Sequence, residues 1–334
     1  MSEDFVWRDA GRTVVFRSGA LELAPAVLRE QGMGPFALLS TERALAGARA
    51  LARSAREVHL VTPGPVPDLA AALLDRVGDA DMVVLGGGRV IDTAKAIASV
   101  SWARVAAIPT TLSGAEMTGI HRLPAGAEDR AKGLVRPLLA IADPEAMTSL
   151  PERALRASAM NALAHGADSL YTPFANPVSR MTALRGAELI ADALDQEPAE
   201  RDRAALALGS ILCAYAIDSG GFAVHHVVCQ TLVRVCGTPH AETNAAILPR
   251  SMALMAPRAP EAIDALAAAI GTDSAGIEAR ILELGGRPGR LGELGVDGAQ
   301  IEQALDAILQ RPELGFSPQP PSREELKELI ESAW

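Results

Sequence analysis

Short apolar runs alternate with amphipathic segments along the first part of the chain. The apolar runs occupy residues 13–16, 36–39, 57–61, 82–85 and 105–108. Alanine- and leucine-rich stretches, such as 68–77 and 93–100, lie between several of them and have helical periodicity. Buried strands that alternate with helices are typical of an α/β layer fold with a parallel sheet. The pattern therefore predicts an α/β domain in this part of the chain.

The pattern changes after Asp143-Pro144, because the chain from Pro151 onward is almost entirely helical in periodicity. Breaks in the pattern are expected at Pro173, Pro177, Gly220-Gly221, Gly237, Pro249 and Gly285-Gly286. We therefore predict an α/β nucleotide-binding domain over residues 1–147 and an all-α domain over residues 148–334. Ser322 with Glu325 has the form of a capping box at the start of a final helix.

Composition and charge narrow the class of protein. The chain has 334 residues, enough for two domains with separate cores, and its net charge of 31 − 41 = −10 includes no long basic block. We expect no nucleic-acid and no membrane partner, and a small molecule as the substrate. The acidic, polar start of the chain lacks the features of a secretory signal, so we expect a cytoplasmic protein. An odd number of cysteines in apolar surroundings, Cys213, Cys229 and Cys236, favours core thiols.

A glycine triplet, Gly86, Gly87 and Gly88, follows an apolar run and precedes a helical stretch. Glycines there let the backbone approach a pyrophosphate, and the positive end of the helix favours the anion. A glycine triplet alone is more often a tight turn, but its place between strand and helix favours a cofactor loop. The spacing differs from G-x-G-x-x-G, so the standard dinucleotide fingerprint is absent.

A second polar loop begins after the next apolar run and contains Thr110, Thr111 and Ser113. Small hydroxyl side chains at the carboxyl end of a strand are suited to contacts with a ribose or a nicotinamide. The two loops together predict a cofactor site at one edge of the sheet.

Four positions in the second domain form a pattern that suggests a metal site or its remnant. Asn161 and His165 are four residues apart in a helical stretch and share one helix face, while His226 and His240 follow other apolar runs. An aspartate in place of Asn161 would complete a carboxylate and three-imidazole set for a transition metal. Asparagine carries no charge and is a much poorer ligand.

These motifs, in this order, resemble the iron-containing alcohol dehydrogenase superfamily and, within it, the maleylacetate reductase-like branch. The motifs are Gly86-Gly87-Gly88 with Asp92 and Lys95, Pro109-Thr110-Thr111, Glu116-Met117-Thr118, Asp143-Pro144-Glu145, Asn161 with His165, His225-His226, Pro239-His240, Pro318-Gln319-Pro320 and Ala333-Trp334. The resemblance implies the dehydroquinate synthase-like architecture of iron-type alcohol dehydrogenases and a homodimer. It also implies NADH or NADPH bound to the first domain, and a substrate in the cleft between the domains.

The resemblance places the family's metal-ligand positions at Asn161, His165, His226 and His240. Since the branch typically has asparagine at the first position and works without metal, we expect no bound metal and vestigial ligand positions. Zinc or iron remains the minority alternative, because three histidines alone can hold Zn²⁺. Without metal, the imidazoles would bind a carboxylate or polarise a carbonyl, and one would protonate the alkoxide. For His225 the sequence leaves open whether it faces the site.

The chain also departs from the family's pattern. Arg89 replaces the usual serine after the glycine triplet, where it would pair with a phosphate, occupy the pyrophosphate space or point to solvent. Gln230 replaces a histidine one turn after His226 and cannot act as a proton donor near neutral pH. In the tail, Ser317 and Gln319 replace asparagine and arginine, which removes a contact to a substrate carboxylate. Ser40-Thr41-Glu42 is the expected position of the adenosine-ribose contact.

The leading hypothesis is a metal-independent NAD(P)H-dependent reductase of a small, carboxylated carbonyl or enoate substrate. Its predicted catalytic residues are His165, His226, His240, Gln230 and Asn161. Its predicted cofactor-binding residues are Gly86, Gly87, Gly88, Arg89, Asp92, Thr110, Thr111, Ser113 and Ser40. Two alternatives remain: a lyase, isomerase or cyclase with a degenerate cofactor site, and a catalytically silent binding protein with the same fold.

Overall fold

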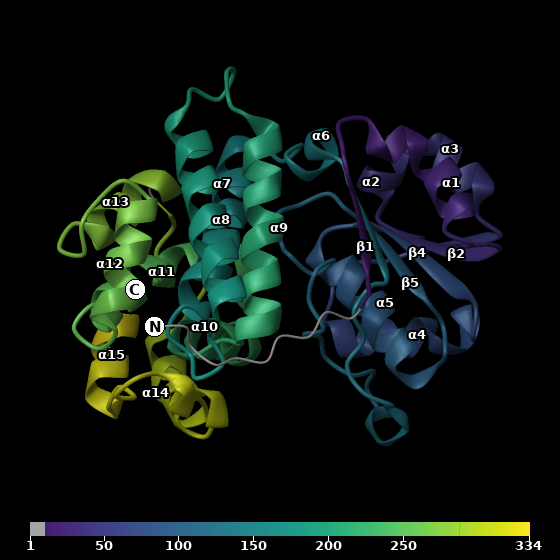
Figure 1. Ribbon diagram of the computed structural model, residues 1–334. Coiled ribbons are helices and arrows are strands. Elements are labelled where there is room, and N and C mark those ends of the chain that lie inside the picture. The colour runs from purple at the N-terminus through teal and green to yellow at the C-terminus, as the bar shows by residue number, and fades with distance from the viewer. Residues whose placement is uncertain (1–10, 287) are drawn as a thin grey trace. The chain divides into compact units, whose positions relative to one another are not determined.

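The computed structural model describes residues 11–286 and 288–334 and divides into two compact units (Figure 1). The first unit ends at Leu150 and the second runs from Pro151 to Trp334, so the division falls three residues after the predicted one. The two units are an α/β unit and a helical unit, as the fold class predicted.

A six-stranded parallel sheet forms the centre of the described α/β unit, in the order β1-β6-β5-β4-β2-β3. The strands are β1 (Thr13–Phe16), β2 (Phe36–Ser40), β3 (Glu57–Leu60), β4 (Asp81–Gly86), β5 (Val105–Pro109) and β6 (Leu139–Ala142). Five of them match the apolar runs of the sequence. The sixth, β6, was missed because its four residues directly precede the Asp143-Pro144 corner.

Helices cover both faces of this sheet, because successive side chains of a strand point to opposite faces. They are α1 (Ala20–Glu30), α2 (Glu42–Ala46), α3 (Arg49–Ser54), α4 (Val66–Val77) and α5 (Gly88–Val100). The unit also contains α6 (Pro144–Met147) and a short 3₁₀ turn η1 (Glu128–Arg130). On β2, Leu38 packs with α1 and α3, whereas the next residue, Leu39, packs with α4 and α5. Such two-sided burial explains why the central strands are apolar throughout.

The direction of the chain changes between β2 and β4, which are neighbours in the sheet. From β2 the chain continues to β3 on one side, and from β4 it continues through α5 to β5 on the other. Ligands of open α/β sheets bind at the carboxyl ends of strands at such a switch point. Ser40 ends β2 and Gly86 ends β4, so this position carries residues predicted to bind the cofactor.

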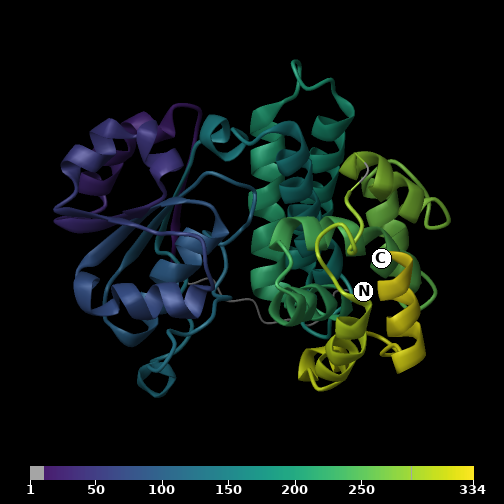
Figure 2. The same ribbon diagram turned by 180° about the vertical axis from the view of Figure 1, so that it is seen from behind.

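The helical unit is built around three long helices, α7 (Glu152–Ser169), α8 (Pro177–Asp195) and α9 (Arg203–Gly220), as Figure 2 shows. The remaining helices are α10 (Val224–Cys236), α11 (His240–Met255), α12 (Pro260–Ala269), α13 (Ile277–Gly285), α14 (Gly298–Leu309), η2 (Pro312–Phe316) and α15 (Arg323–Ser332). The predicted capping box of the last helix is present, because Ser322 Oγ accepts from the Glu325 amide at 3.3 Å.

Small residues let α7, α8 and α9 approach closely. A Cβ atom on Gly166 would lie 2.9 Å from Cys213 Sγ, and one on Gly186 would lie 2.6 Å from the same sulfur. Since real Cβ contacts are longer, neither position has room for a side chain. The Cys213 thiol therefore fills the space between two glycines and is fully buried.

The expected break at Pro249 was wrong, because this proline lies inside α11. A proline within a helix removes one backbone hydrogen bond and usually bends or ends the helix. Here the residues around it, Leu248 and Met252, are completely buried. Packing of the helix against its neighbours therefore outweighs the missing hydrogen bond.

No single helix among the described residues is long and apolar enough to cross a membrane. The pair α9 and α10, bent by 99°, passes the same test of length and composition when taken together.

Candidate active site

Asn161 and His165 lie on one face of α7, as their spacing predicted, and both side chains are buried. Neither Asn161 Oδ1 nor His165 Nδ1 has a hydrogen-bond partner among the described residues. Buried polar atoms are normally satisfied, so an unpartnered pair on one face indicates a place for a ligand.

His226 joins this pair from α10. Its ring stacks on that of His165, with the centroids 5.2 Å apart and the planes 18° from parallel. Its Nε2 atom is also buried and has no partner among the described residues. The structure therefore brings Asn161, His165 and His226 together, with one unpartnered polar atom on each.

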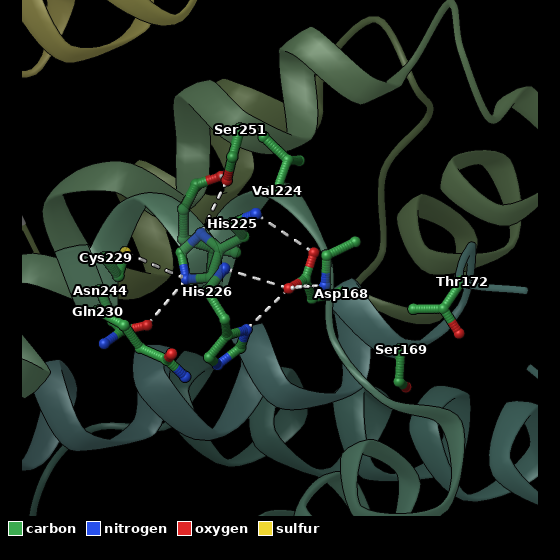
Figure 3. A network of polar contacts seen from close by, with 12 residues as sticks. Asp168, Ser169, Thr172, Val224, His225, His226, Cys229, Gln230, Asn244 and Ser251 are labelled. Carbon is green, nitrogen blue, oxygen red and sulfur yellow. Dashed lines mark hydrogen bonds and ion pairs between the residues drawn. The ribbon is translucent and has the colours of Figure 1, made fainter. Parts of the chain in front are cut away.

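Asp168, which the sequence analysis missed, organises this group (Figure 3). Its carboxylate accepts hydrogen bonds from His226 Nδ1 at 2.9 Å and from the backbone amides of Ala223, His226 and His225 at 2.9, 3.1 and 3.3 Å. The Tyr171 hydroxyl donates a further bond. Asp168 thus caps the amino-terminal end of α10, where the helix leaves its amides without partners.

The charge of Asp168 is favoured by these donors. Its complete burial acts to raise the pKa of the carboxyl, but the bonds from His226 and Tyr171 outweigh burial and hold the pKa below its usual range. An ionised carboxylate only accepts, so His226 Nδ1 carries a proton and donates it. The other ring nitrogen, Nε2, therefore presents a lone pair when the ring is neutral.

The surroundings of His165 disfavour its charged form, unlike those of Asp168. Burial, and then the neighbouring His226, His240 and His225, hold the pKa of His165 well below its usual value. His165 is therefore neutral at physiological pH. It can offer one hydrogen bond to a ligand but no positive charge.

The structure settles the position of His225, which the sequence left open. Its Nε2 lies 2.8 Å from Asn244 Oδ1 and its Nδ1 lies 2.9 Å from Ser251 Oγ. Burial lowers the pKa of His225 to about 3, so the ring is neutral and both nitrogens are used within the core. His225 joins α10 to α11 and has no capacity left for a ligand. Cys229, 3.6 Å from this ring, is a buried core thiol whose pKa burial raises well above the usual value.

His240 occupies the first position of α11 and its residue is exposed. The Asn244 side-chain amide donates to the His240 carbonyl at 2.8 Å and so fixes the start of the helix. Within residues 11–286 and 288–334, no three His, Cys, Asp or Glu side chains are placed to hold one metal ion.

Gln230 lies one turn after His226 and is half-buried. Its Oε1 accepts a hydrogen bond from Arg311 Nη2 at 3.1 Å. Arg311 was not among the predicted site residues, because it follows α14 and is 81 residues distant in sequence.

In the α/β unit, the glycine triplet lies against the second polar loop. A Cβ atom on Gly87 would lie 2.9 Å from Thr111 Cγ2, and one on Gly88 would lie 3.1 Å from Ser113 Cβ. Thr111 Oγ1 is buried without a partner among the described residues. Close backbone approach and an unsatisfied hydroxyl at the start of α5 fit the binding of a phosphate-bearing cofactor.

Ser40 and Thr110 make hydrogen bonds that join neighbouring strands, whereas Arg89 lies at the surface. Ser40 Oγ donates to the Leu85 carbonyl at 2.8 Å, which joins β2 to β4, and the Thr110 amide donates to the Gly86 carbonyl at 3.0 Å. Arg89 is exposed at the start of α5, and which of its three predicted roles it takes stays a prediction.

Asp92 forms an ion pair with Lys95, whose Nζ atom lies 2.8 Å from Asp92 Oδ1. Lys95 is completely buried and also donates to the carbonyl oxygens of Ala115 and Ile120, at 3.1 and 2.8 Å. The pair therefore fixes the loop after β5 to α5. This contact gives Asp92 a structural role, and its predicted contact with the cofactor stays a prediction.

Glu116, within the same loop, is completely buried, and neither carboxyl oxygen has a hydrogen-bond partner in another described residue. Burial raises the pKa of Glu116 to about 7, although its own backbone amide and the charges of Lys95 and Arg12 act in the other direction. Nothing in the local sequence predicts this state, since the loop is rich in small polar residues.

Comparison with known proteins identifies the family. Residues 15–121 match the family described as iron-containing alcohol dehydrogenase, and residues 156–334 match the Fe-containing alcohol dehydrogenase family, C-terminal. The chain is 32% identical to maleylacetate reductase 1 of Rhodococcus opacus over 100% of this chain and 97% of that protein. It is 33% identical to maleylacetate reductase of Burkholderia cepacia, over 96% and 95% of the two chains.

Solved structures support the same family assignment. The crystal structure of maleylacetate reductase from Agrobacterium tumefaciens superposes with a TM-score of 0.85 at 30% identity, and covers 99% of this chain and 98% of that one. The chain belongs to the iron-containing alcohol dehydrogenase family, in its maleylacetate reductase-like branch, and is an oxidoreductase.

Proposed function

We propose that this oxidoreductase reduces a small, carboxylated carbonyl or enoate compound with NADH or NADPH and without a metal ion. The observation that carries the proposal is the His226–Asp168 pair, in which a fixed imidazole presents an unpartnered, buried Nε2 atom. The names of the relatives, which are maleylacetate reductases, support the class of substrate.

The α/β unit supplies the binding surface for the cofactor. Gly87 and Gly88 leave room for a pyrophosphate at the start of α5, and the Thr111 hydroxyl is placed to form a hydrogen bond. When bound, the nicotinamide supplies the hydride that adds to the substrate carbon. Arg89, exposed at the same helix end, can pair with a phosphate.

His226 has the environment of a proton donor. As the new C–H bond forms, the π electrons of the carbonyl move to its oxygen, which then takes a proton. Protonated His226 can deliver that proton from Nε2, because the Asp168 carboxylate stabilises the imidazolium through Nδ1. Neutral His165 and the Asn161 amide can bind the same oxygen or its neighbours.

The residues present do not fit a metal ion. Asn161 offers a neutral amide oxygen in place of a carboxylate, and no three His, Cys, Asp or Glu side chains of the described residues are placed to hold one ion. Divalent transition metals prefer anionic or closely grouped imidazole ligands. We therefore propose that the family's metal-ligand positions bind the substrate directly in this chain.

The test is a nicotinamide oxidation assay on a panel of small keto and enol acids, with wild-type protein and His226→Gln. We expect His226→Gln to lower kcat by about 100-fold or more, with NADH affinity unchanged. His59→Gln, outside the group, is the control. Overnight dialysis against a chelator should leave activity intact. Activity lost to the chelator and restored by zinc or iron would reject the metal-free proposal.

The alternative of a non-redox enzyme does not agree with the oxidoreductase identity of the chain. We also propose a homodimer, as the resemblance implies, which light scattering after gel filtration tests.

A further inference from the structure

Arg311 is held in a fixed position beside α10. Its Nη2 atom donates to Gln230 Oε1 at 3.1 Å, and its Nε atom donates to Glu313 Oε2 at 2.9 Å. The side chain is 19% exposed, so most of it is shielded from water. Two acceptors on different segments therefore fix the guanidinium group.

The segment after Arg311 runs back along the same helix. Arg311 contacts Gln230 near the middle of α10, and Ser317, at the end of η2, accepts from the Val224 amide at 3.1 Å. His226 lies between these two contacts along the helix. Arg311 is therefore attached to the part of α10 that carries the unpartnered imidazole.

Gln230 and His226 share a face of α10, since they are four residues apart, and a turn of helix separates them by about 6 Å along the axis. Figure 3 shows both side chains on the same side of α10. An anchor at Gln230 thus lies one helical turn from His226 Nε2.

The contact with Arg311 fixes the orientation of the Gln230 amide. A guanidinium only donates, so the amide oxygen faces Arg311 and its NH₂ group points elsewhere. Within the described residues, no hydrogen bond involves Arg311 Nη1. Arg311 and Gln230 therefore each keep an N–H donor beside the contact that joins them, and neighbouring donors of this kind suit a carboxylate.

We propose that Arg311 and Gln230 form a carboxylate subsite, which selects substrates whose carboxylate lies about one helical turn from the reacting carbonyl. The inference rests on the proposed function, because it assigns the reacting carbonyl to His226. It also connects two departures from the family. The tail has lost its arginine at Gln319, and an arginine from another segment reaches the site through Gln230.

The test compares 4-oxopentanoate with its methyl ester, which has the same carbonyl but no charge. In Arg311→Met, we expect kcat/KM for the acid to fall about 10- to 100-fold, the range for a lost charged hydrogen bond, and that for the ester to change less than about twofold. Gln230→Glu would place a second protein carboxylate beside Arg311, in addition to Glu313, and should lower kcat/KM for the acid more than for the ester. Arg323→Met, whose arginine lies in an exposed ion-pair group on α15, is the matched control.

Three results would overturn the inference: equal losses for acid and ester in Arg311→Met, no loss for either, or a wild-type enzyme that reduces the ester as well as the acid. Each of these leaves the proposed function intact. If wild-type protein oxidises no NADH with any carbonyl, the proposed function fails. Calorimetric titration of NAD⁺-loaded protein with 4-oxopentanoate then tests the carboxylate subsite by itself. Weaker binding of the acid in Arg311→Met supports the subsite, and no binding to wild-type protein rejects it.

Discussion

Asp168 in the helical unit and Glu116 in the α/β unit are both carboxylates with no exposed surface, yet their surroundings differ. Asp168 accepts from a ring nitrogen, a hydroxyl and three backbone amides. No other described residue donates a hydrogen bond to Glu116, and the charge of Lys95 reaches it through space. The comparison separates burial, which the two share, from hydrogen bonding, which they do not.

The two pKa values move in opposite directions as a result. Donors hold the pKa of Asp168 below its usual range despite burial, whereas burial raises the pKa of Glu116 to about 7. Asp168 is therefore a permanent charge that orients His226. Glu116 changes its protonation state near neutral pH.

Asp168→Asn should have the largest effect, because an amide cannot accept from all of these donors. We expect a loss of about 4 kcal/mol in the free energy of unfolding, typical of breaking a buried charged contact. We also expect kcat to fall by about 10³-fold, because the His226 tautomer is no longer fixed. Urea unfolding and steady-state kinetics measure the two. Asp192→Asn, on the exposed face of α8, is the control, and equal stability of the two variants would contradict the role of Asp168.

Glu116→Gln tests the other side of the comparison through pH. Because the pKa of Glu116 is raised from 4.5 to about 7 in the folded state, the folded protein binds an extra proton between these values. The contribution of this proton to the free energy of unfolding is fully present below pH 4.5. It is lost as the pH rises through 7, which lowers the free energy of unfolding by about 3 kcal/mol. The difference in unfolding free energy between Glu116→Gln and wild type should therefore shift in favour of the variant by this amount from pH 4.5 to 8. A difference that is constant with pH would show that Glu116 is not the titrating group.

Lys95→Met removes the charge that most favours ionised Glu116 and leaves two loop carbonyls without their donor. We expect a loss of about 2 kcal/mol in unfolding free energy, and a pKa of Glu116 that moves further upward. Repeating the pH series in the Lys95→Met background measures both. Lys327→Met, on the exposed surface of α15, is the control. An unchanged pH profile would contradict the through-space effect.

Tyr171→Phe removes one donor of Asp168 and leaves the others in place. We expect the smallest effect, about 1 kcal/mol in unfolding free energy, because the carboxylate keeps four hydrogen bonds. Thermal unfolding measured at pH 7 is sensitive enough to detect it. A loss as large as that of Asp168→Asn would mean that the donors act as one unit.

Local patterns in the sequence predicted the architecture and half of the site. The apolar runs gave five of the six strands, because strands buried on both faces must be apolar throughout. The i, i+4 spacing placed Asn161 and His165 on one helix face, and the glycine triplet marked the start of α5. Helical periodicity alone is visible only from residue 93, five residues after the start of α5 at Gly88, since glycines weaken the helical pattern.

Long-range partners could not be predicted in the same way. Asp168 reads as an ordinary acidic residue within a helix, and its main partner, His226, is 58 residues away. Arg311 reaches Gln230 across 81 residues, and nothing in the local sequence of either residue signals the contact. Such pairs depend on how helices pack, which is set by the whole unit rather than by any one segment.

The Cys213 thiol is enclosed between Gly166 and Gly186, so the rate at which a reagent labels it reports how often the helical unit opens. Burial raises the pKa of Cys213 to about 12, and its sulfur contacts three helices, so a thiol reagent reaches it only after α7, α8 and α9 separate. Cys236, half-buried at the end of α10, reacts without such an event and serves as an internal reference. The ratio of the two labelling rates therefore records how often this three-helix core opens under native conditions.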